Sequence, residues 1–483
     1  MKALKLAAVL VVAACSRGGM TSAPVPARYA PSARESALAD TVAERTFRWF
    51  WETTDTLTGL AHDRWPRTDF SSVASIGFAL TAYPVGAERG WVTRAQAARR
   101  TLTTLRYLWT LPQGPAAKGM GGHKGFFYHF LRYTDGQRFE NVELSTIDTS
   151  LLLGGALFAQ SYYTGSDTTE VAIRAYADSL YRRVEWPWAV TRAPRVSMGW
   201  KPESGYITAD WKGYNEAMLL YILALGSPTH PLGRDAWDAW SSTNAWRRYR
   251  GQDHVNFTPL FGHQYSHVWI DFRGIRDAYM QGKGIDWFEN SRRATLAQRQ
   301  YAIDNPRGFR DYGPTIWGLT AADGPADTLL TWKDGPLQLH TYWARGASAF
   351  DDADGAERDD GTIAPTAAIG SLPFAPEIAF PAMVAMRERY GDALFTRYGF
   401  HDSFNPTMLD LPGVKLSHGA VVPGAGWIAP DHLGIDQGPI VAMLENHRSG
   451  LIWRTMRRNP YVVAGLRRAG FTGGWLDSTS TGR

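Results

Sequence analysis

Most of the chain is patterned as helices of two alternating kinds. One kind begins with polar residues and continues with small and apolar residues on every side, which predicts a helix buried all round. Six stretches have this pattern: 71–86, 145–163, 212–227, 262–279, 375–391 and 434–450. Between them lie amphipathic segments with a charged face, such as 93–109 and 286–304. A buried helix that alternates about six times with an amphipathic one predicts two concentric rings of helices, the all-α (α/α)6 barrel.

Strand-like alternation is scarce. The best short candidates are RVSMGW (195–200) and GTIAPTA (361–367). The longest interval between buried-helix patterns, residues 305–374, carries Pro, Gly and Asp, and we expect it to form loops or a small sheet over one end of the barrel. The uneven spacing of the six stretches argues against a solenoid with a fixed repeat.

The first fifteen residues have the outline of an export signal. Two lysines precede an apolar run, residues 6–12, which is too short to span a membrane. The run ends in VAAC (12–15), which resembles the lipobox of bacterial lipoproteins, and Cys15 is the only cysteine of the chain. We therefore expect Cys15 to be the lipidated N-terminus of an exported lipoprotein of the bacterial cell envelope, the alternative being an ordinary cleaved signal. Ser16, where Asp would favour inner-membrane retention, favours the outer membrane, on its periplasmic or surface face.

The rest of the chain divides into three parts. Residues 16–35 are rich in Ser, Pro and Ala and predict a flexible tether, residues 36–470 predict one helical catalytic domain, and residues 471–483 form a tail.

The net charge is +5, the basic residues are scattered, and the longest charge cluster, 351–360, is mostly acidic. This balance excludes a nucleic-acid partner and a polybasic membrane surface, so we expect a monomer that touches the membrane only through its lipid. The 20 Trp, 21 Tyr and 21 Phe suit the binding of sugar faces.

The polar starts of the buried helices are the candidate site. The inner helices of such a barrel run parallel, so their N-terminal residues would converge on one end of a central cavity. The candidates, in chain order, are Glu143, Asp148, Tyr214, Asn215, Glu216, His263, Gln264, His267, Trp269, Arg273, Glu377, Asp436 and Gln437. Asp402, in the loop before the last of these helices, is a further candidate. Each carboxylate could instead only stabilise the first turn of its helix. Repeated carboxylates on apolar helices are costly to bury, however, and therefore favour a polar cavity that needs them.

Several kinds of chemistry are disfavoured. His263 and His267 are four residues apart and could share a metal, but neither an HExxH motif nor a third ligand accompanies them, so we expect no metal. The glycine-rich GMGGHKG (119–125) matches no phosphate-binding fingerprint, there is no G-x-S-x-G, and no cysteine follows Cys15. We expect no cofactor.

Two carboxylates across an aromatic-lined cavity are what glycoside hydrolysis requires. One must be protonated to donate to the leaving oxygen, and the other must be ionised to activate water or attack C1. We predict that Glu216 is the acid. Burial beside Tyr214 and Met218 would raise its pKa and a helix N-terminus would lower it, and the residues do not show which effect is larger.

Long stretches of the chain resemble the bacterial glycoamylase-like family, in particular the endo-β-1,2-glucanases of glycoside hydrolase family 144. The resemblance covers residues 40–470 and includes ELSTIDTSLLLGGAL (143–157), GYNEAMLLYILALGSPTHP (213–231) and GIDQGPIVAMLENHRSGLIW (434–453), together with 71–91, 261–295, 301–325 and 359–379. It implies an (α/α)6 barrel, inverting hydrolysis of β-1,2-glucan, and an acid at the glutamate of YNEA, Glu216. Asp402, Asp148 and Asp436 all lie in matching regions as candidates for the base, and Trp317 is a further substrate-binding candidate.

Two other functions fit parts of the pattern. A polysaccharide lyase on an α/α toroid could use Tyr214, a histidine and Arg273, although the acidic cluster argues against a polyanionic substrate. A non-catalytic glycan-binding lipoprotein would use the acids only as hydrogen-bond acceptors, which does not require so many buried carboxylates.

Overall fold

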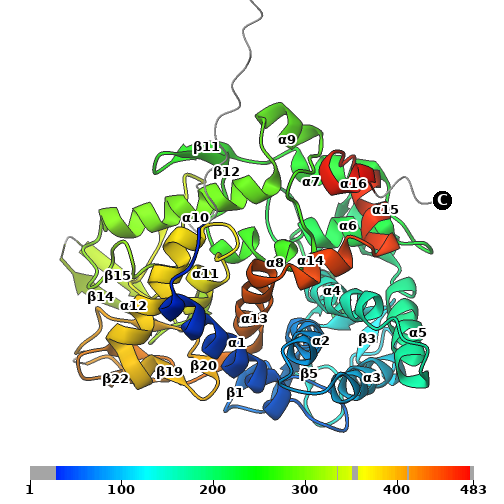
Figure 1. Ribbon diagram of the computed structural model, residues 1–483, viewed down its shortest axis with the longest axis horizontal. Helices are drawn as coiled ribbons and strands as arrows, with labels where there is room; N and C mark the ends of the chain where they lie inside the picture. Colours follow the sequence, from blue (N-terminus) through cyan, green and yellow to red (C-terminus); the bar gives the residue numbers. More distant parts are fainter. Residues whose placement is uncertain (1–28, 334, 351–356, 411–412, 479–483) are drawn as a thin grey trace, which may run out of the picture. The chain divides into compact units, whose positions relative to one another are not determined.

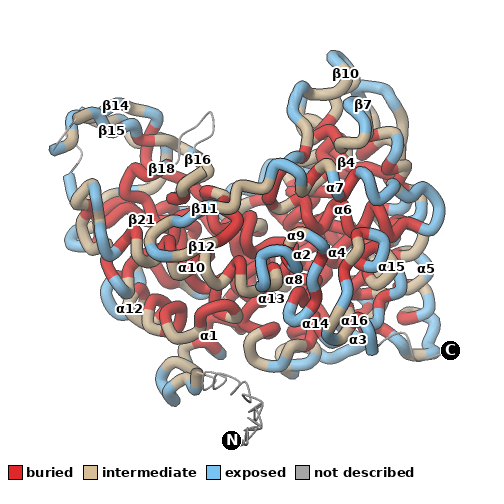
Figure 2. The backbone as a smooth tube through the Cα atoms, turned by 90° about the horizontal axis from the view of Figure 1, so that it is seen from above, coloured by how far each residue is buried: buried red, intermediate tan, exposed pale blue. Residues whose placement is uncertain are grey.

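Within the described residues, six helices are buried on nearly every side and form the centre of the fold (Figures 1 and 2). They are α2 (Val73–Glu88), α4 (Thr146–Tyr162), α6 (Met218–Gly226), α8 (Tyr265–Trp269), α11 (Pro365–Ile369) and α13 (Gly434–Arg448). α2 packs against α4 and α13, α4 against α6, α6 against α8, and α11 against α13. Their residues are mostly small or aliphatic, so other elements can surround each helix.

The computed structural model describes residues 29–333, 335–350, 357–410 and 413–478. The chain divides after Ala30 into a short N-terminal unit and a large unit from Pro31 onward. The predicted export signal, Cys15 and most of the predicted tether lie outside the described residues. None of the described helices has the length and apolar character needed to cross a membrane.

Amphipathic helices cover the buried ones. The long ones are α1 (Ala33–Thr53), α3 (Arg94–Thr110), α5 (Thr168–Arg182), α10 (Trp287–Asp304) and α12 (Pro376–Leu394). The shorter ones are α7 (Arg234–Ser241), α9 (Ala278–Lys283), α14 (Leu451–Met456), α15 (Pro460–Arg468) and α16 (Gly474–Ser478). The amphipathic predictions for 93–109 and 286–304 are confirmed by α3 and α10. Side-chain caps begin several of these helices; Thr93 and Gln96, for example, form a capping box at α3.

The strands are short and all their pairings are antiparallel. A five-stranded sheet has the order β10 (Gly205–Tyr206), β9 (Gly199–Lys201), β6 (Leu144–Ser145), β4 (Phe126–Tyr128), β3 (Gly122–His123), and a three-stranded sheet has the order β21 (Phe404–Asn405), β23 (Gly426–Ile428), β22 (Ala420–Val422). The pairs are β1 (Arg64–Trp65) with β24 (His432–Leu433), β2 (Phe70–Ser72) with β5 (Phe130–Arg132), β7 (Val190–Arg192) with β8 (Arg195–Val196), β11 (Trp246–Tyr249) with β12 (Gln252–Val255), β13 (Ala321–Asp323) with β16 (Tyr342–Ala344), β14 (Thr328–Trp332) with β15 (Gly335–Leu339), β17 (Gly346–Ala347) with β18 (Glu357–Arg358), and β19 (Phe395–Thr396) with β20 (Gly399–Phe400). β14 and β15 lie at the top left of Figure 2, and β7 and β10 lie in a separate group at the top right.

The prediction of a mainly helical chain is confirmed, and strands β13 to β18 occupy the interval 305–374 as expected. The candidate strand 195–200 is confirmed in part by β8 and β9. In 361–367, by contrast, most of the segment leads into the buried helix α11, which begins at Pro365.

Three predicted helices differ from the observed ones. α6 begins at Met218 rather than near Tyr214, because the Asn215 side chain accepts the backbone N–H of Ala217 and holds a turn instead. The stretch 262–279 is not one helix: a 3-10 turn, η2 (Leu260–His263), precedes α8, and extended chain separates α8 from α9. The fifth predicted stretch, 375–391, forms α12, which turns a charged face outward. The buried helix is α11, which precedes it.

The folded part extends beyond the predicted boundaries at both ends. α1 begins at Ala33, where Ser32 and Glu35 form a capping box. Towards the C-terminus, Phe471 and Leu476 are buried in the main core, which places the start of the predicted tail within the fold.

Two glycines allow α2 and α4 to approach closely. A Cβ atom at Gly155 would lie 2.0 Å from the carbonyl oxygen of Gly77, and one at Gly77 would lie 2.3 Å from the carbonyl oxygen of Leu151. Both obstacles are backbone atoms of packed helices, which a rotamer change does not move. The glycines are therefore required by helix packing.

We predict that Gly155→Ala lowers the free energy of unfolding by about 1–3 kcal/mol, because the added methyl forces α2 and α4 apart. Gly282→Ala in α9 is the matched control, since its Cβ would meet nothing within 4 Å. It should leave stability unchanged or raise it by up to about 1 kcal/mol. Urea unfolding followed by circular dichroism measures both, and equal stabilities would contradict the close-packing argument.

Candidate active site

Glu216 sits in a tight turn immediately before α6. Gly213 has a φ of 67°, which suits glycine, and opens the turn. The side-chain oxygen of Asn215 accepts the N–H of Ala217 and the indole N–H of Trp240, each at 3.1 Å. The Ser266 hydroxyl donates to the carbonyl oxygen of Glu216 at 3.0 Å. The backbone of Glu216 is thus fixed, and these contacts leave its carboxyl group unused.

The Glu216 carboxyl group has the character of a general acid. Its Oε2 atom is buried and has no hydrogen-bond partner among the described residues. Burial raises the pKa of Glu216 to about 7; its own backbone N–H opposes this shift, and the charge of Asp148 reinforces it. Loss of hydration therefore outweighs the favourable backbone contact, and a large fraction of Glu216 carries a proton at neutral pH.

Asp402 and Asp436 form a pair of buried carboxyl groups, separate from Glu216. Burial raises the pKa of Asp402 to about 7, helped by the charge of Asp323. Burial and the nearby Asp402 raise the pKa of Asp436 well above its ordinary value. Two adjacent carboxyl groups do not both ionise readily, so the pair retains one proton. Asp436 is the member that keeps it, and Asp402 is the member that ionises.

Arg64, on β1, lies among the carboxylates that surround Asp402. Its guanidinium contacts Asp63 at 3.1 Å, Asp323 at 3.0 Å and Asp431 at 3.4 Å. The backbone N–H of Asp323 donates to Asp402 Oδ2 at 2.8 Å, and the N–H of Asp402 donates to the Asp431 carbonyl oxygen at 3.0 Å. Arg64 and the backbone N–H of Asp323 both favour the ionised form of Asp402.

His129 lies between two further carboxylates, Glu143 and Asp148. His129 Nδ1 lies 2.8 Å from Glu143 Oε1, and its Nε2 lies 3.6 Å from Asp148 Oδ2. Burial alone would lower the pKa of His129, but the charges of Asp148 and Glu143 outweigh it and raise the pKa to about 9. His129 is therefore a cation at neutral pH, and Asp148, which also accepts from Ser145, is already partnered.

Tyr265, at the start of α8, is influenced by the charges of Glu216 and of the Asp402–Asp436 pair. Burial raises its pKa far above the ordinary tyrosine value, and the charges of Asp436, Glu216 and Asp402 add to this. The pKa of this one phenol therefore responds to Glu216 and to the Asp402–Asp436 pair. Its ring packs on Phe261 and against Phe78, which fixes its position.

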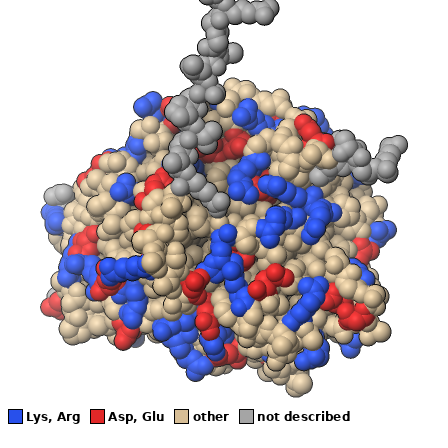
Figure 3. Space-filling view, in the orientation of Figure 1, with Lys and Arg blue, Asp and Glu red and all other residues tan. Residues whose placement is uncertain are grey.

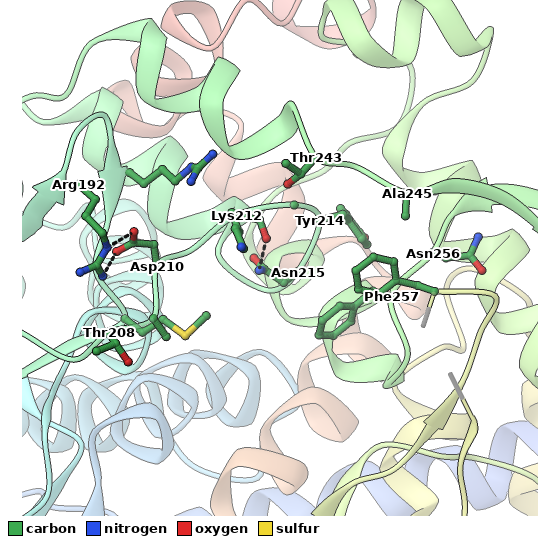
Figure 4. Close-up of a pocket in the computed structure, with 15 residues that line it drawn as sticks. Arg192, Thr208, Asp210, Lys212, Tyr214, Asn215, Thr243, Ala245, Asn256 and Phe257 are labelled. Atoms are coloured by element: carbon green, nitrogen blue, oxygen red, sulfur yellow. Dashed lines mark hydrogen bonds and ion pairs between the residues drawn. The ribbon is translucent and has the colours of Figure 1, made fainter. Parts of the chain in front are cut away.

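A cavity of about 730 Å³ opens beside the Glu216 turn (Figure 4). Gly213, Tyr214 and Asn215 line it, so it shares a wall with the turn. None of Glu216, Asp402 and Asp436 lines it, so the cavity lies beside the turn and does not enclose these carboxyl groups.

The comparisons with known proteins show the family of the chain. The glycoamylase family model, described as "Putative glucoamylase", matches residues 208–460, just over half of the chain. The chain belongs to the glycoamylase family. A Bacteroides uniformis structure, described as a "putative glucoamylase", is 32% identical with a TM-score of 0.76, covering 93% of this chain and 100% of that one.

Two relatives carry more specific descriptions. An endo-β-1,2-glucanase of Chitinophaga pinensis, solved with sophorotriose and glucose, is 28% identical with a TM-score of 0.75, covering 92% of this chain and 100% of that one. An exo β-1,2-glucooligosaccharide sophorohydrolase (non-reducing end) of Parabacteroides distasonis is 28% identical over 468 residues, or 90% of this chain. The present chain spans 58% of the length of that relative.

Several predicted substrate contacts are instead packed into the core of this family member. His267 is buried among aromatic rings and bonds Ser291, and Trp269 donates its indole N–H to Thr81. Gln264 donates to the Ala367 carbonyl oxygen, and Arg273 pairs with Asp271 beyond the end of α8. Further candidates with packing contacts are Trp317 (fully buried), Gln437 (bonded to Phe400), His263 (near Tyr214 and the Phe257 carbonyl oxygen) and Glu377 (paired with Arg292 at the surface).

The two histidines proposed as a possible metal pair are on different elements. His263 ends η2 and His267 lies in α8, so the helix face expected from their spacing does not exist. Among the described residues, no group of three or more His, Asp or Glu side chains is placed to hold a metal ion.

Sequence reasoning missed the groups that set the charge balance of the site. They are Asp63, Arg64, His129, Asp323 and Asp431. They lie on short strands and loops with no helical period, so no hydrophobic pattern marked them. The sequence signal that could have found them is an acidic residue next to a histidine or an arginine, as in HDR (62–64).

We predict that His129→Gln lowers the free energy of unfolding by about 2 kcal/mol near pH 6. A histidine whose folded pKa is about 9 stabilises fully below pH 6.5, and this stabilisation is lost as the pH rises through 9. Glu143, with a folded pKa of about 2, contributes above pH 4.5. The difference from wild type should therefore be largest between pH 4.5 and 6.5 and shrink towards pH 9.

Urea unfolding across this pH range measures the effect. His230→Gln, in an exposed loop, is the matched control and should not alter stability. A His129→Gln deficit that did not change with pH would contradict the charge-pairing role.

Proposed function

We propose that this protein is an inverting glycoside hydrolase that cleaves β-1,2-glucan at internal bonds. The observation that carries the proposal is the presence of an unpartnered, high-pKa Glu216 together with the Asp402–Asp436 pair, all three of which raise the pKa of Tyr265. The β-1,2 linkage is supported by the relatives, both of which are described as acting on β-1,2-linked glucose chains.

The proposed mechanism uses one proton donor and one base. Glu216 donates its proton to the glycosidic oxygen as the bond to C1 breaks. Ionised Asp402 accepts a proton from a water molecule, and that water attacks C1 from the opposite face. Asp436 retains its proton and keeps a second charge away from Asp402, while Arg64 favours the ionised form of Asp402. Asp148 is disfavoured as the base because His129 and Ser145 already bind it.

The proposed architecture is the (α/α)6 barrel. Along the chain, covering and buried helices alternate as α1–α2, α3–α4, α5–α6, α7–α8, α10–α11 and α12–α13. That order suits an inner ring of α2, α4, α6, α8, α11 and α13. The catalytic domain then extends from Pro31 to Ser478.

We predict that Glu216→Gln and Asp402→Asn each lower kcat on β-1,2-glucan by about 10²–10⁴-fold, because each removes a proton-transfer group. Asp436→Asn should retain more activity than Asp402→Asn, since an amide replaces a carboxyl group that is already neutral. The assay measures new reducing ends and the anomer first released. Wild-type rates in folded Glu216→Gln would remove the acid assignment, and products absorbing as unsaturated sugars would indicate a lyase.

The pH dependence follows from the same two groups. Loss of the Glu216 proton above its pKa of about 7 should lower kcat/KM on the alkaline side. Protonation of Asp402, also with a pKa of about 7, should lower it on the acidic side. We expect a narrow bell with its maximum near pH 7. A flat profile from pH 5 to 9 would contradict the assignment.

We also propose that the protein is an exported lipoprotein anchored to the outer membrane through Cys15. The support is the signal-like segment and the lipobox resemblance in the sequence. Cys15→Ser should abolish incorporation of labelled palmitate in a bacterial host and release the enzyme from the membrane fraction. Unchanged fractionation of Cys15→Ser would contradict the anchor.

A further inference from the structure

The charged residues that line the cavity beside the Glu216 turn are mostly basic. Arg192 is paired with Asp210, the only acidic residue of the lining, as the dashed lines in Figure 4 show. Arg195 and Lys212 also line the cavity. Neither makes a side-chain hydrogen bond or an ion pair with any described residue. Among the described residues, the rim therefore carries two basic groups without an acidic partner.

Many basic side chains elsewhere on the surface are paired with an acidic one. On the face shown in Figure 3, basic and acidic side chains are interspersed. Among the ion pairs of the described residues, Arg397 pairs with Glu52, and Arg448 with Asp40. The absence of such partners at Arg195 and Lys212 leaves their charges available to a bound molecule.

The remaining lining suits a sugar. Phe257, Phe350 and Met198 provide apolar surface, and Tyr214 belongs both to the cavity wall and to the turn that precedes Glu216. A glucan chain that extends from the catalytic acid along this turn would place its neighbouring sugar units in the cavity. Its hydroxyl groups, or groups attached to them, would then face the rim.

We infer that this cavity binds an anionic substituent, a carboxylate or a phosphate ester, carried by the glucan near the bond that is cleaved. The inference rests on the proposed function, since it concerns the substrate of that reaction. Arg195 and Lys212 form the ion pairs with the substituent, and the aromatic wall contacts the sugar that bears it. The enzyme then favours charged glucans over neutral ones.

The test compares three forms of β-1,2-glucan with the full-length protein. One is unsubstituted, one carries sparse O-succinyl half-esters, and one carries the same groups as neutral methyl esters. We expect kcat/KM on the half-ester form to exceed that on the methyl ester by roughly 3–10-fold, as two partly exposed ion pairs allow. The ratio should fall with added salt. A parallel arm with phosphate monoesters separates the two anion classes.

The double variant Arg195→Gln/Lys212→Gln should bring the half-ester to methyl-ester ratio close to one. Arg99→Gln/Lys118→Gln, at two exposed positions away from the cavity, removes the same charge and should keep the wild-type ratio. A wild-type ratio of one or below, or an equal loss in the control variant, overturns the inference. Failure to cleave unsubstituted β-1,2-glucan would instead overturn the proposed function.

Discussion

Buried carboxyl groups must be neutralised, and the site is organised by the ways in which this is done. A carboxylate moved out of water is stable only with a proton, a cation or several N–H donors. Arg64 pairs with one cluster of carboxyl groups, and His129 shares its one positive charge between Glu143 and Asp148. Glu216 has neither cation beside it and is left with a proton. The division between positioning groups and the acid thus follows from which carboxyl groups received a cation.

The packing of the buried helices makes this chemistry possible. Gly77 and Gly155 bring α2 and α4 into backbone contact, and the surrounding helices present mostly small and aliphatic side chains. A close-packed, apolar surrounding excludes the water that would otherwise solvate a carboxylate. The raised pKa of Glu216 is therefore a property of the whole helical assembly, transmitted to one side chain by the turn that Asn215 and Ser266 hold.

The sequence predicted most of the buried and covering helices, because a stretch apolar on every side has few other structures. Glu216 and Asp436 became candidates for the same reason, since polar groups stand out beside such stretches, and Asp402 became one as a loop acid within the family resemblance. It misjudged α8 and α11, which have five residues each, too few to show a helical period. His267 and Trp269 were misread because a buried polar ring and a substrate-binding ring look alike in sequence, and only their partners distinguish them.

The sequence around Asp402 or Asp436 alone does not show which of the two ionises more readily. Asp402 and Asp436 are equivalent candidates by position, and both are buried. Their difference arises because ionising one opposes ionising the other, and because the Asp323 N–H and Arg64 favour charge on Asp402. Four residues from distant segments decide that preference together. An identical pair without Arg64 would hold its proton more tightly on both members and would lack an effective base at neutral pH.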